Sequence, residues 1–322
     1  MPRSKTRKHK KITSRKHQHK NSKRHHKRKT MKQKNKTIIK NSTGKIRKEQ
    51  CSPKPNGEEL DFTCYSKSSI HMLKESWNLR HPDSAITSNE PREIWNQLKY
   101  LMRNTCNKES CWLRHQCIKH DLPHGIYLDN FSPKQPKEWK SKPTTWLTSI
   151  DIEKVMQQYE KKYSDFRFLG PSPIDYDQRK MFNQCVWEEL CRFQLLDYKN
   201  KGITKIGVIF NLDPHTEDGS HWVALFINLK KRTVYYFDSY GDPPHKQITK
   251  FRKTVQKQAA HLGIKLKYKL LKKRHQYKNS ECGMYCLYFI IKMLEGKPVE
   301  FFDKRIDDDY MVKMRNKFFN KR

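Results

Sequence analysis

Two stretches rich in apolar residues predict a β-hairpin in the second half of the chain. Residues 221–229 and 233–238 are rich in β-branched and aromatic side chains, which favour strands. Residues 230–232 between them are Lys-Lys-Arg, a polar segment typical of a tight turn. Folding the hairpin there brings His221 opposite residues 238–240, where cross-strand Cβ atoms lie about 5 Å apart.

The same patterns of apolar and polar residues predict the elements around this hairpin. Helical periodicity and strand-like runs alternate along the chain. Helices are expected at residues 149–161, 179–193, 247–262 and 307–319, strands at 205–212 and 264–271, and a long apolar helix beginning at Cys282. Helices packed on a small mixed sheet of this kind define an α+β fold.

The first half of the chain predicts a separate helical region. Apolar residues at helical spacing predict helices at residues 68–78, 93–103 and 109–118, so we expect residues 51–130 to form a small helical arm. A Pro-rich stretch follows, and we expect residues 131–145 to be a linker and residues 146–322 to be the main domain.

Positive charge is concentrated in the first 50 residues. They hold 21 Lys and Arg and one acid, Glu49, in a chain whose net charge is +36. Such a segment cannot bury enough apolar surface to offset its ordering entropy, so we expect residues 1–50 to be a disordered basic tail. Polycations bind nucleic acid by releasing counterions, which favours non-specific nucleic-acid binding by this tail. A nuclear-import patch at residues 22–29 and a solubilising tail without a defined partner are the alternatives.

The chain shows no targeting or spanning segment. The tail lacks the apolar core of a secretory signal, and no stretch of the chain reaches about 18 apolar residues. We therefore expect a soluble protein with no membrane partner.

The nine cysteines raise the question of a metal site or a disulfide framework. Cys106, Cys111, Cys117 and His120 lie close together, but their spacing does not match paired Cys-x2-Cys knuckles. We therefore expect no metal and no cofactor, and we expect reduced, mostly buried cysteines, as in a cytosolic protein. Three of these cysteines are assigned to the packed core: Cys185, Cys191 and Cys286.

One cysteine stands where reactive chemistry is expected. Cys282 opens the apolar helix directly after a polar, loop-like run, and the N-terminus of a helix favours the thiolate form of a cysteine. Gly283 leaves the sulfur uncrowded, and the side-chain amide of Gln276 lies six residues upstream. Alone, Cys282 fits a buried structural cysteine, and His221 with Asp238 fits an ordinary strand-end contact. Together they match a nucleophile, a base and an orienting acid.

The order His-Trp, Asp-Ser and Gln-x5-Cys-Gly resembles the SUMO-specific and adenovirus-type cysteine proteases. The resemblance covers residues 146–319 and implies a papain-like cysteine protease core. It implies His221 as general base, Asp238 as its orienting acid, Cys282 as nucleophile and Gln276 as part of the oxyanion hole. It also implies substrate-binding roles for Trp222 and for Trp146, the two walls of a narrow substrate tunnel.

Several segments resemble the polyprotein proteases of large nucleocytoplasmic DNA viruses, of the African swine fever virus type. They are residues 169–175, 219–222 and 237–241. The chain departs from the SUMO-specific pattern at Thr148-Ser149, where that pattern commonly has Asn-Asp, the acid that contacts a folded ubiquitin-like partner.

The resemblance implies a thiol endopeptidase that cleaves after Gly-Gly in viral structural polyproteins during virion maturation. Its location would be the virion and the host cytoplasm, with the nucleus as a further possibility. A protease that removes SUMO or other ubiquitin-like modifiers is the alternative within the same class, and an acyltransferase is a more distant one. A non-catalytic nucleic-acid-binding virion protein is the alternative from a different class.

Overall fold

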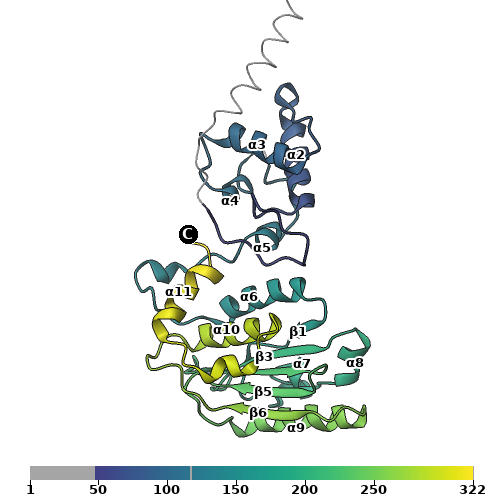
Figure 1. Cartoon of the computed structure of the whole chain (residues 1–322), viewed down its shortest axis with the longest axis vertical. Coiled ribbons are helices and arrows are strands. Elements are labelled where there is room, and N and C mark those ends of the chain that lie inside the picture. The colour runs from purple at the N-terminus through teal and green to yellow at the C-terminus, as the bar shows by residue number, and fades with distance from the viewer. Residues whose placement is uncertain (1–47, 117, 322) are drawn as a thin grey trace, which may run out of the picture. The chain divides into compact units, whose positions relative to one another are not determined.

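The computed structural model describes residues 48–116 and 118–321, and the expected basic tail lies outside them except for its last three residues (Figure 1). The described chain forms two compact units. One consists of Ile70–Asp121, and the other combines Lys48–Ser69 with the chain from Leu122 onward. The expected boundaries of the helical arm at residues 51 and 130 therefore differ from these units, because both ends of that segment belong to the larger one.

The smaller unit is helical, as the periodicity predicts. Its main helices are α2 (Lys67–Arg80, which begins in the larger unit) and α3 (Pro91–Met102), with a 3-10 turn η1 (Pro82–Ser84) between them. The third expected helix is reduced to α4 (Glu109–Trp112). The buried apolar side chains are Ile70, Leu73 and Trp77 in α2 and Ile94, Leu98 and Met102 in α3. The periodicity selects all of these except Met102, and Leu101, which it selects in that place, is only half-buried.

The larger unit contains a mixed sheet with the strand order β1-β3-β4-β5-β6, and β2 also pairs with β3. The strands β3 (Lys205–Asn211), β4 (Trp222–Asn228) and β5 (Thr233–Phe237) are antiparallel neighbours. The short strands β1 (Phe166–Phe168) and β2 (Ser172–Pro173) run parallel to β3, and β6 (Lys267–Leu271) runs parallel to β5. The expected hairpin is therefore confirmed as β4 and β5, and β6 extends the sheet beyond it.

Helices cover both faces of this sheet (Figure 1). One face packs against α6 (Ser149–Lys162) and α10 (Cys282–Leu294), and α11 (Asp308–Phe318) packs on α10. The other packs against α9 (Lys246–His261) and the short helices α7 (Glu188–Cys191) and α8 (Leu195–Asn200). The remaining short helices are α5 (Ile126–Asn130), η2 (Lys137–Lys140), η3 (Met181–Asn183) and η4 (Val299–Asp303). The α+β fold expected from the sequence is confirmed.

The helix expected at residues 179–193 is wrong. Phe182 and Asn183 adopt positive φ angles of 58° and 61°, which an α-helix does not allow. The backbone N–H groups of Val186 and Trp187 donate instead to the carbonyls of Gln178 and Tyr176, at 3.0 Å each. The segment folds back on the residues before it, and only α7 remains α-helical.

The stretch expected to be a linker is packed into the larger unit. Phe131 and Trp139 are buried, and the ring of Trp139 meets Phe319 edge-on with the centroids 5.2 Å apart. The backbone around Lys134 pairs with Asn320 near the end of the chain. Gln50 joins the same arrangement, since its N–H donates to the Asn320 side chain at 2.7 Å. Packing therefore extends to both sides of the expected linker and into the last residue of the expected tail.

The expectation of reduced cysteines is wrong for six of the nine. The structure has disulfides between Cys51 and Cys64, between Cys106 and Cys111, and between Cys185 and Cys191. Two cysteines of the cluster considered for a metal are thus bonded to each other. Free thiols among the described residues are Cys282 and Cys286, both buried. Within residues 48–116 and 118–321, no helix has the length and apolar character needed to cross a membrane.

Candidate active site

The β4–β5 hairpin brings His221 and Asp238 together. Ala224 pairs with Phe237, so the same register carried three residues back along β4 sets His221 opposite Tyr240. The Nε2 atom of His221 lies 2.7 Å from Oδ1 of Asp238, and the two side chains are only 10% and 2% exposed. Because Nε2 is bonded to Asp238, Nδ1 is the ring nitrogen left for a second partner.

Cys282 is the first residue of α10, as the sequence predicts, and it is 1% exposed. The backbone N–H groups of the first helical turn have no partner within the helix, so they can stabilise negative charge beside this residue. Close packing, rather than backbone freedom, favours Gly283 here. A Cβ atom on Gly283 would lie 3.2 Å from Cβ of Leu147 and 3.4 Å from Cδ1 of Trp222.

The imidazole of His221 interacts with both Asp238 and Cys282, and these interactions shift its pKa. Burial lowers this pKa, but hydrogen bonds to Asp238 and to Cys282, together with their charges, outweigh burial and raise it from 6.5 to about 9. His221 therefore interacts with both the carboxylate and the thiol, as a base that takes the proton of Cys282 must. By contrast, burial raises the pKa of the Cys286 thiol well above its usual value, so Cys286 is a neutral core residue.

Gln276 is fully buried, and its amide is held in one orientation. The hydroxyl of Ser239 donates to Oε1 of Gln276 at 2.7 Å. Nε2 donates to the carbonyl of Lys278 at 2.6 Å and lies 3.4 Å from the hydroxyl of Tyr240. Both amide hydrogens therefore have acceptors, but the contact with Tyr240 is long and weak, so a stronger acceptor can replace that hydroxyl.

A buried ion pair fixes the start of α10. Glu281, directly before Cys282, receives hydrogen bonds from Nε and Nη2 of Arg315 on α11, both at 2.8 Å. The side chains of Arg315 and Glu281 are 3% and 0% exposed. Arg315 also donates to the carbonyl of Thr145 at 2.7 Å, next to Trp146. One guanidinium therefore joins α11, the residue before the candidate nucleophile and the segment that carries Trp146.

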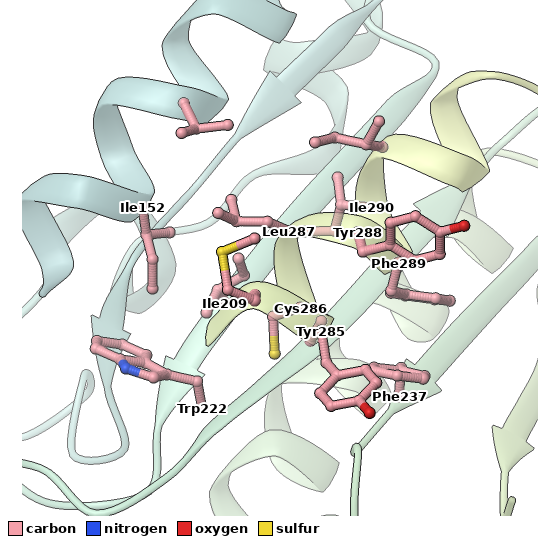
Figure 2. Close-up of a cluster of buried hydrophobic side chains, with 14 of the residues drawn as sticks. Ile152, Ile209, Trp222, Phe237, Tyr285, Cys286, Leu287, Tyr288, Phe289 and Ile290 are labelled. Carbon is pink, nitrogen blue, oxygen red and sulfur yellow. The ribbon is translucent and has the colours of Figure 1, made fainter. Parts of the chain in front are cut away.

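The two tryptophans predicted to bind substrate line one groove of about 660 Å³. Trp222 is mostly buried in the core beside α10 (Figure 2), and its indole N–H donates to the carbonyl of Leu147 at 3.2 Å. The groove contains no lysine or arginine, and the residues that line it come from residues 145–153, 171–173, 187, 211–219 and 222. A larger groove of about 840 Å³ along α6, β1 and α8 contains none of the predicted site residues.

The structure thus brings together the residues that the sequence selects, and it adds others that the sequence analysis missed. His221, Asp238, Cys282 and Gln276 converge at one end of the sheet, with Trp146 and Trp222 in the adjoining groove. Tyr240 and Arg315 were missed because their importance depends on contacts between distant segments. The position of Tyr240 two residues after Asp238, at the level of His221 in the hairpin, was the one local signal.

Comparison with known proteins identifies relatives among cysteine proteases. The Ulp1 protease family, C-terminal catalytic domain, matches residues 199–322, which include the four converging residues. The chain is 34% identical over 231 residues to a protein of Acanthamoeba polyphaga mimivirus named as a thiol protease, covering 71% of this chain and 74% of that protein. It is 26% identical over 258 residues to the SUMO-1 cysteine protease of African swine fever virus, covering 75% of this chain and 93% of that protein.

The fold is also similar to that of a solved viral protease. The crystal structure of the African swine fever virus protease superposes with a TM-score of 0.59, covering 85% of this chain and 96% of that chain at 20% sequence identity. At this identity the likeness concerns the fold alone.

Proposed function

Because the chain belongs to the Ulp1 protease family and is a cysteine protease, we propose that it cleaves peptide bonds with a Cys282-His221-Asp238 triad. The observation that carries the proposal is the position of His221. Its ring is hydrogen-bonded to the buried Asp238 carboxylate and to the Cys282 thiol at the N-terminus of α10. An orienting acid, a base and a nucleophile arranged in this order are the minimal set for thiol catalysis.

In the proposed reaction, His221 takes the thiol proton of Cys282, and the thiolate attacks the carbonyl carbon of the scissile bond. The backbone N–H of Cys282 stabilises the oxyanion, together with the second side-chain N–H of Gln276, which exchanges its long contact with the Tyr240 hydroxyl for the oxyanion. The protonated His221 then donates its proton to the leaving amine as the C–N bond breaks. Water, deprotonated by His221, attacks the thioester, and the carboxylate product leaves as Cys282 recovers its proton.

The groove between Trp146 and Trp222 supports Gly-Gly before the cleaved bond. Leu147 and Trp222 pack directly against Gly283, next to the nucleophile, so there is little room for substrate side chains at that point. Two glycines can approach such a surface because they have no Cβ. We attribute this preference for Gly-Gly to the crowding around Gly283.

The start of α6 favours a viral polyprotein over a folded modifier as substrate. Thr148 and Asp151 form a reciprocal capping box: the Asp151 N–H donates to Oγ1 of Thr148 at 3.3 Å, and the Thr148 N–H donates to Oδ2 of Asp151 at 3.0 Å. The acid of this segment is therefore occupied in capping the helix, and Ser149 offers no carboxylate to a partner. Cleavage of structural polyproteins would take place in the assembling virion and the host cytoplasm.

The proposal is tested with three matched substrates: a quenched peptide containing Gly-Gly, the same peptide with Ala-Ala, and a linear ubiquitin-like precursor ending in Gly-Gly plus a short extension. We expect cleavage of the Gly-Gly peptide and slow or no processing of the folded precursor. Efficient processing of the precursor, with the peptide poorly cleaved, would assign the enzyme to modifier removal. Equal cleavage of the Ala-Ala peptide would contradict the crowded groove.

A further inference from the structure

Tyr240 contacts three of the four residues assigned to catalysis. Its ring stacks on the imidazole of His221, with centroids 4.7 Å apart and planes 16° apart. Its backbone N–H donates to Oδ1 of Asp238 at 2.9 Å, the same oxygen that bonds His221. Its hydroxyl lies 3.4 Å from Nε2 of Gln276.

A tight turn after β5 holds Tyr240 in this position. The N–H of Gly241 donates to the carbonyl of Asp238 at 3.0 Å, which closes the turn over residues 238–241. Gly241 has a φ of 82°, and a Cβ there would lie 2.6 Å from the backbone oxygen of Lys272. Any other residue at position 241 would be strained in backbone angle and would clash with that carbonyl.

A cation lies over the same tyrosine ring. The guanidinium of Arg274 is 5.3 Å from the centroid of Tyr240 and 4.7 Å from that of Tyr277. Its Nε donates to the backbone carbonyl of Gln276 at 3.0 Å, so Arg274 is itself held in place. Tyr240 is therefore confined between groups that are fixed by other elements of the fold.

A single hydrogen bond to Asp238 does not fix the plane of the His221 ring, because the ring can still pivot about that bond. A stacked aromatic ring removes this freedom. The face of an aromatic ring also attracts a cation, so it stabilises the protonated imidazole more than the neutral one. The titratable groups that face His221 are the Asp238 carboxylate, the Cys282 thiol and the Tyr240 phenol, with Arg274 beyond the phenol.

We propose that Tyr240 is a positioning residue that holds the His221 imidazole in the plane shared by Asp238 and Cys282 and stabilises its protonated form. The inference rests on the proposed triad. The Tyr240 phenol carries no charge beside His221, because burial raises its pKa above the usual value.

The test compares Tyr240→Leu, which removes the aromatic face, with Tyr240→Phe, which keeps the face and removes the hydroxyl. Measurements are kcat and KM for the Gly-Gly peptide as a function of pH, together with the rate at which iodoacetamide alkylates Cys282. We expect Tyr240→Leu to lower kcat about 10- to 100-fold with little change in KM. We expect the alkaline limb of the kcat/KM profile to move down by about 0.5–1 pH unit, as the loss of a cation–π contact implies.

Tyr240→Phe should restore most of the lost kcat and return the alkaline limb to the parent position. Tyr277→Leu is the matched control, because Tyr277 also lies beneath Arg274 but does not contact His221. A lower melting temperature with an unshifted alkaline limb in Tyr240→Leu would assign Tyr240 a purely structural role and overturn the inference. So would a shift of equal size in Tyr277→Leu. The proposed function itself fails separately, if Cys282→Ser cleaves the peptide as well as the parent.

Discussion

The helices α10 and α9 cover opposite faces of one sheet, yet they are built differently. In α10 every residue except Lys292 is buried, and side chains surround the helix on all sides (Figure 2). In α9 only Ile248, Phe251, Val255 and Ala259 are buried, and the outer face carries lysines. One apolar stripe is enough to cover a sheet. Full burial does more, because it fixes where the helix begins, and α10 begins at Cys282.

The N-termini of α10 and α9 are also stabilised by different kinds of contact. The start of α10 is held by the buried pair of Glu281 and Arg315 and by packing on Gly283. The start of α9 is capped by its own neighbour, since the N–H of Gln247 donates to Nδ1 of the exposed His245 at 3.3 Å. A catalytic position requires contacts from distant segments, whereas a covering helix can rely on local ones. Matched substitutions on the two helices, or beside them, test this difference.

The largest effect is expected at the nucleophile. Cys282→Ser should abolish cleavage of the Gly-Gly peptide while the protein remains folded, because the reactive thiolate is lost and little volume changes. Cys286→Ser, one turn further along α10, should lose some stability but keep most of its kcat/KM. Peptide cleavage and circular dichroism measure both variants, and activity of Cys282→Ser close to that of the parent would contradict the mechanism.

The next largest effect is expected for the buried ion pair. Arg315→Met should lower the free energy of unfolding by about 3–5 kcal/mol, because it leaves the Glu281 carboxylate buried without its partner. The control on the α9 side is Lys250→Met. Lys250 pairs with Asp177 at 2.6 Å but is 64% exposed, so its loss should cost less than about 1 kcal/mol.

Urea unfolding of Arg315→Met, Lys250→Met and the double variant Glu281→Leu/Arg315→Met provides the comparison. The double variant should regain much of the lost stability, because both charges are then absent. Equal losses of unfolding free energy in Arg315→Met and Lys250→Met would contradict the claim that α10 and α9 are held by different kinds of contact.

The third largest effect is expected at Gln276, which we propose as a donor to the oxyanion. Gln276→Ala should lower kcat by about 10²–10³ with little change in KM, the usual result of losing one oxyanion donor. Gln247→Ala is the matched control, since that amide donates to Asp177 at 3.0 Å on the α9 side of the sheet. Steady-state kinetics measure both, and a change confined to KM would move Gln276 from transition-state stabilisation to substrate binding.

A smaller effect is expected at His275, directly before Gln276. Burial, with Lys273 and Arg305 nearby, lowers the pKa of His275 from 6.5 to about 4. The folded protein therefore keeps this imidazole neutral, and its contribution to stability is complete above pH 6.5. Below that pH the unfolded chain binds the proton first, so stability falls as the pH drops from 6.5 to about 4, by up to about 1.4 kcal/mol per pH unit.

The variant His275→Asn keeps an acceptor for the N–H of Ile306, which donates to Nδ1 of His275 at 3.1 Å, and removes the titration. We expect it to be less stable near neutral pH but to lose stability less steeply toward pH 4. Unfolding curves from pH 4 to 8 measure the slopes, and an unchanged slope in His275→Asn would contradict the assignment.

The smallest effect on catalysis is expected from the basic tail. Because Gln50 is bonded to Asn320, the deletion should end at residue 47 rather than 50. Cleavage of the short peptide should remain nearly unchanged, while the plot of log affinity for duplex DNA against log salt becomes flatter. If the truncated protein keeps the same slope, binding lies on the folded part, where α9 offers Lys246, Lys250, Lys253 and Lys257 on one face.

The elements with local signals could be predicted from the amino-acid sequence. The hairpin, α6, α9, α10 and α11 follow from strand-like composition or helical spacing within each segment, because side-chain burial repeats with the period of the backbone. The candidate site follows only in part from these local patterns. His221 and Asp238 flank one hairpin, and the resemblance in the order of motifs connects them with Gln276 and Cys282.

Features that depend on partners far along the chain become visible only in the folded protein. Residues 182–183 are not α-helical, although the local composition favours a helix. The backbone N–H groups of Val186 and Trp187 donate instead to the carbonyls of Gln178 and Tyr176. The pairing of Cys185 with Cys191 likewise depends on that fold-back. Arg315 reaches Glu281 across 34 residues and Thr145 across 170, separations at which local patterns carry no information. Tyr240 stacks on His221 only because the hairpin register and the turn at Gly241 bring the two rings together.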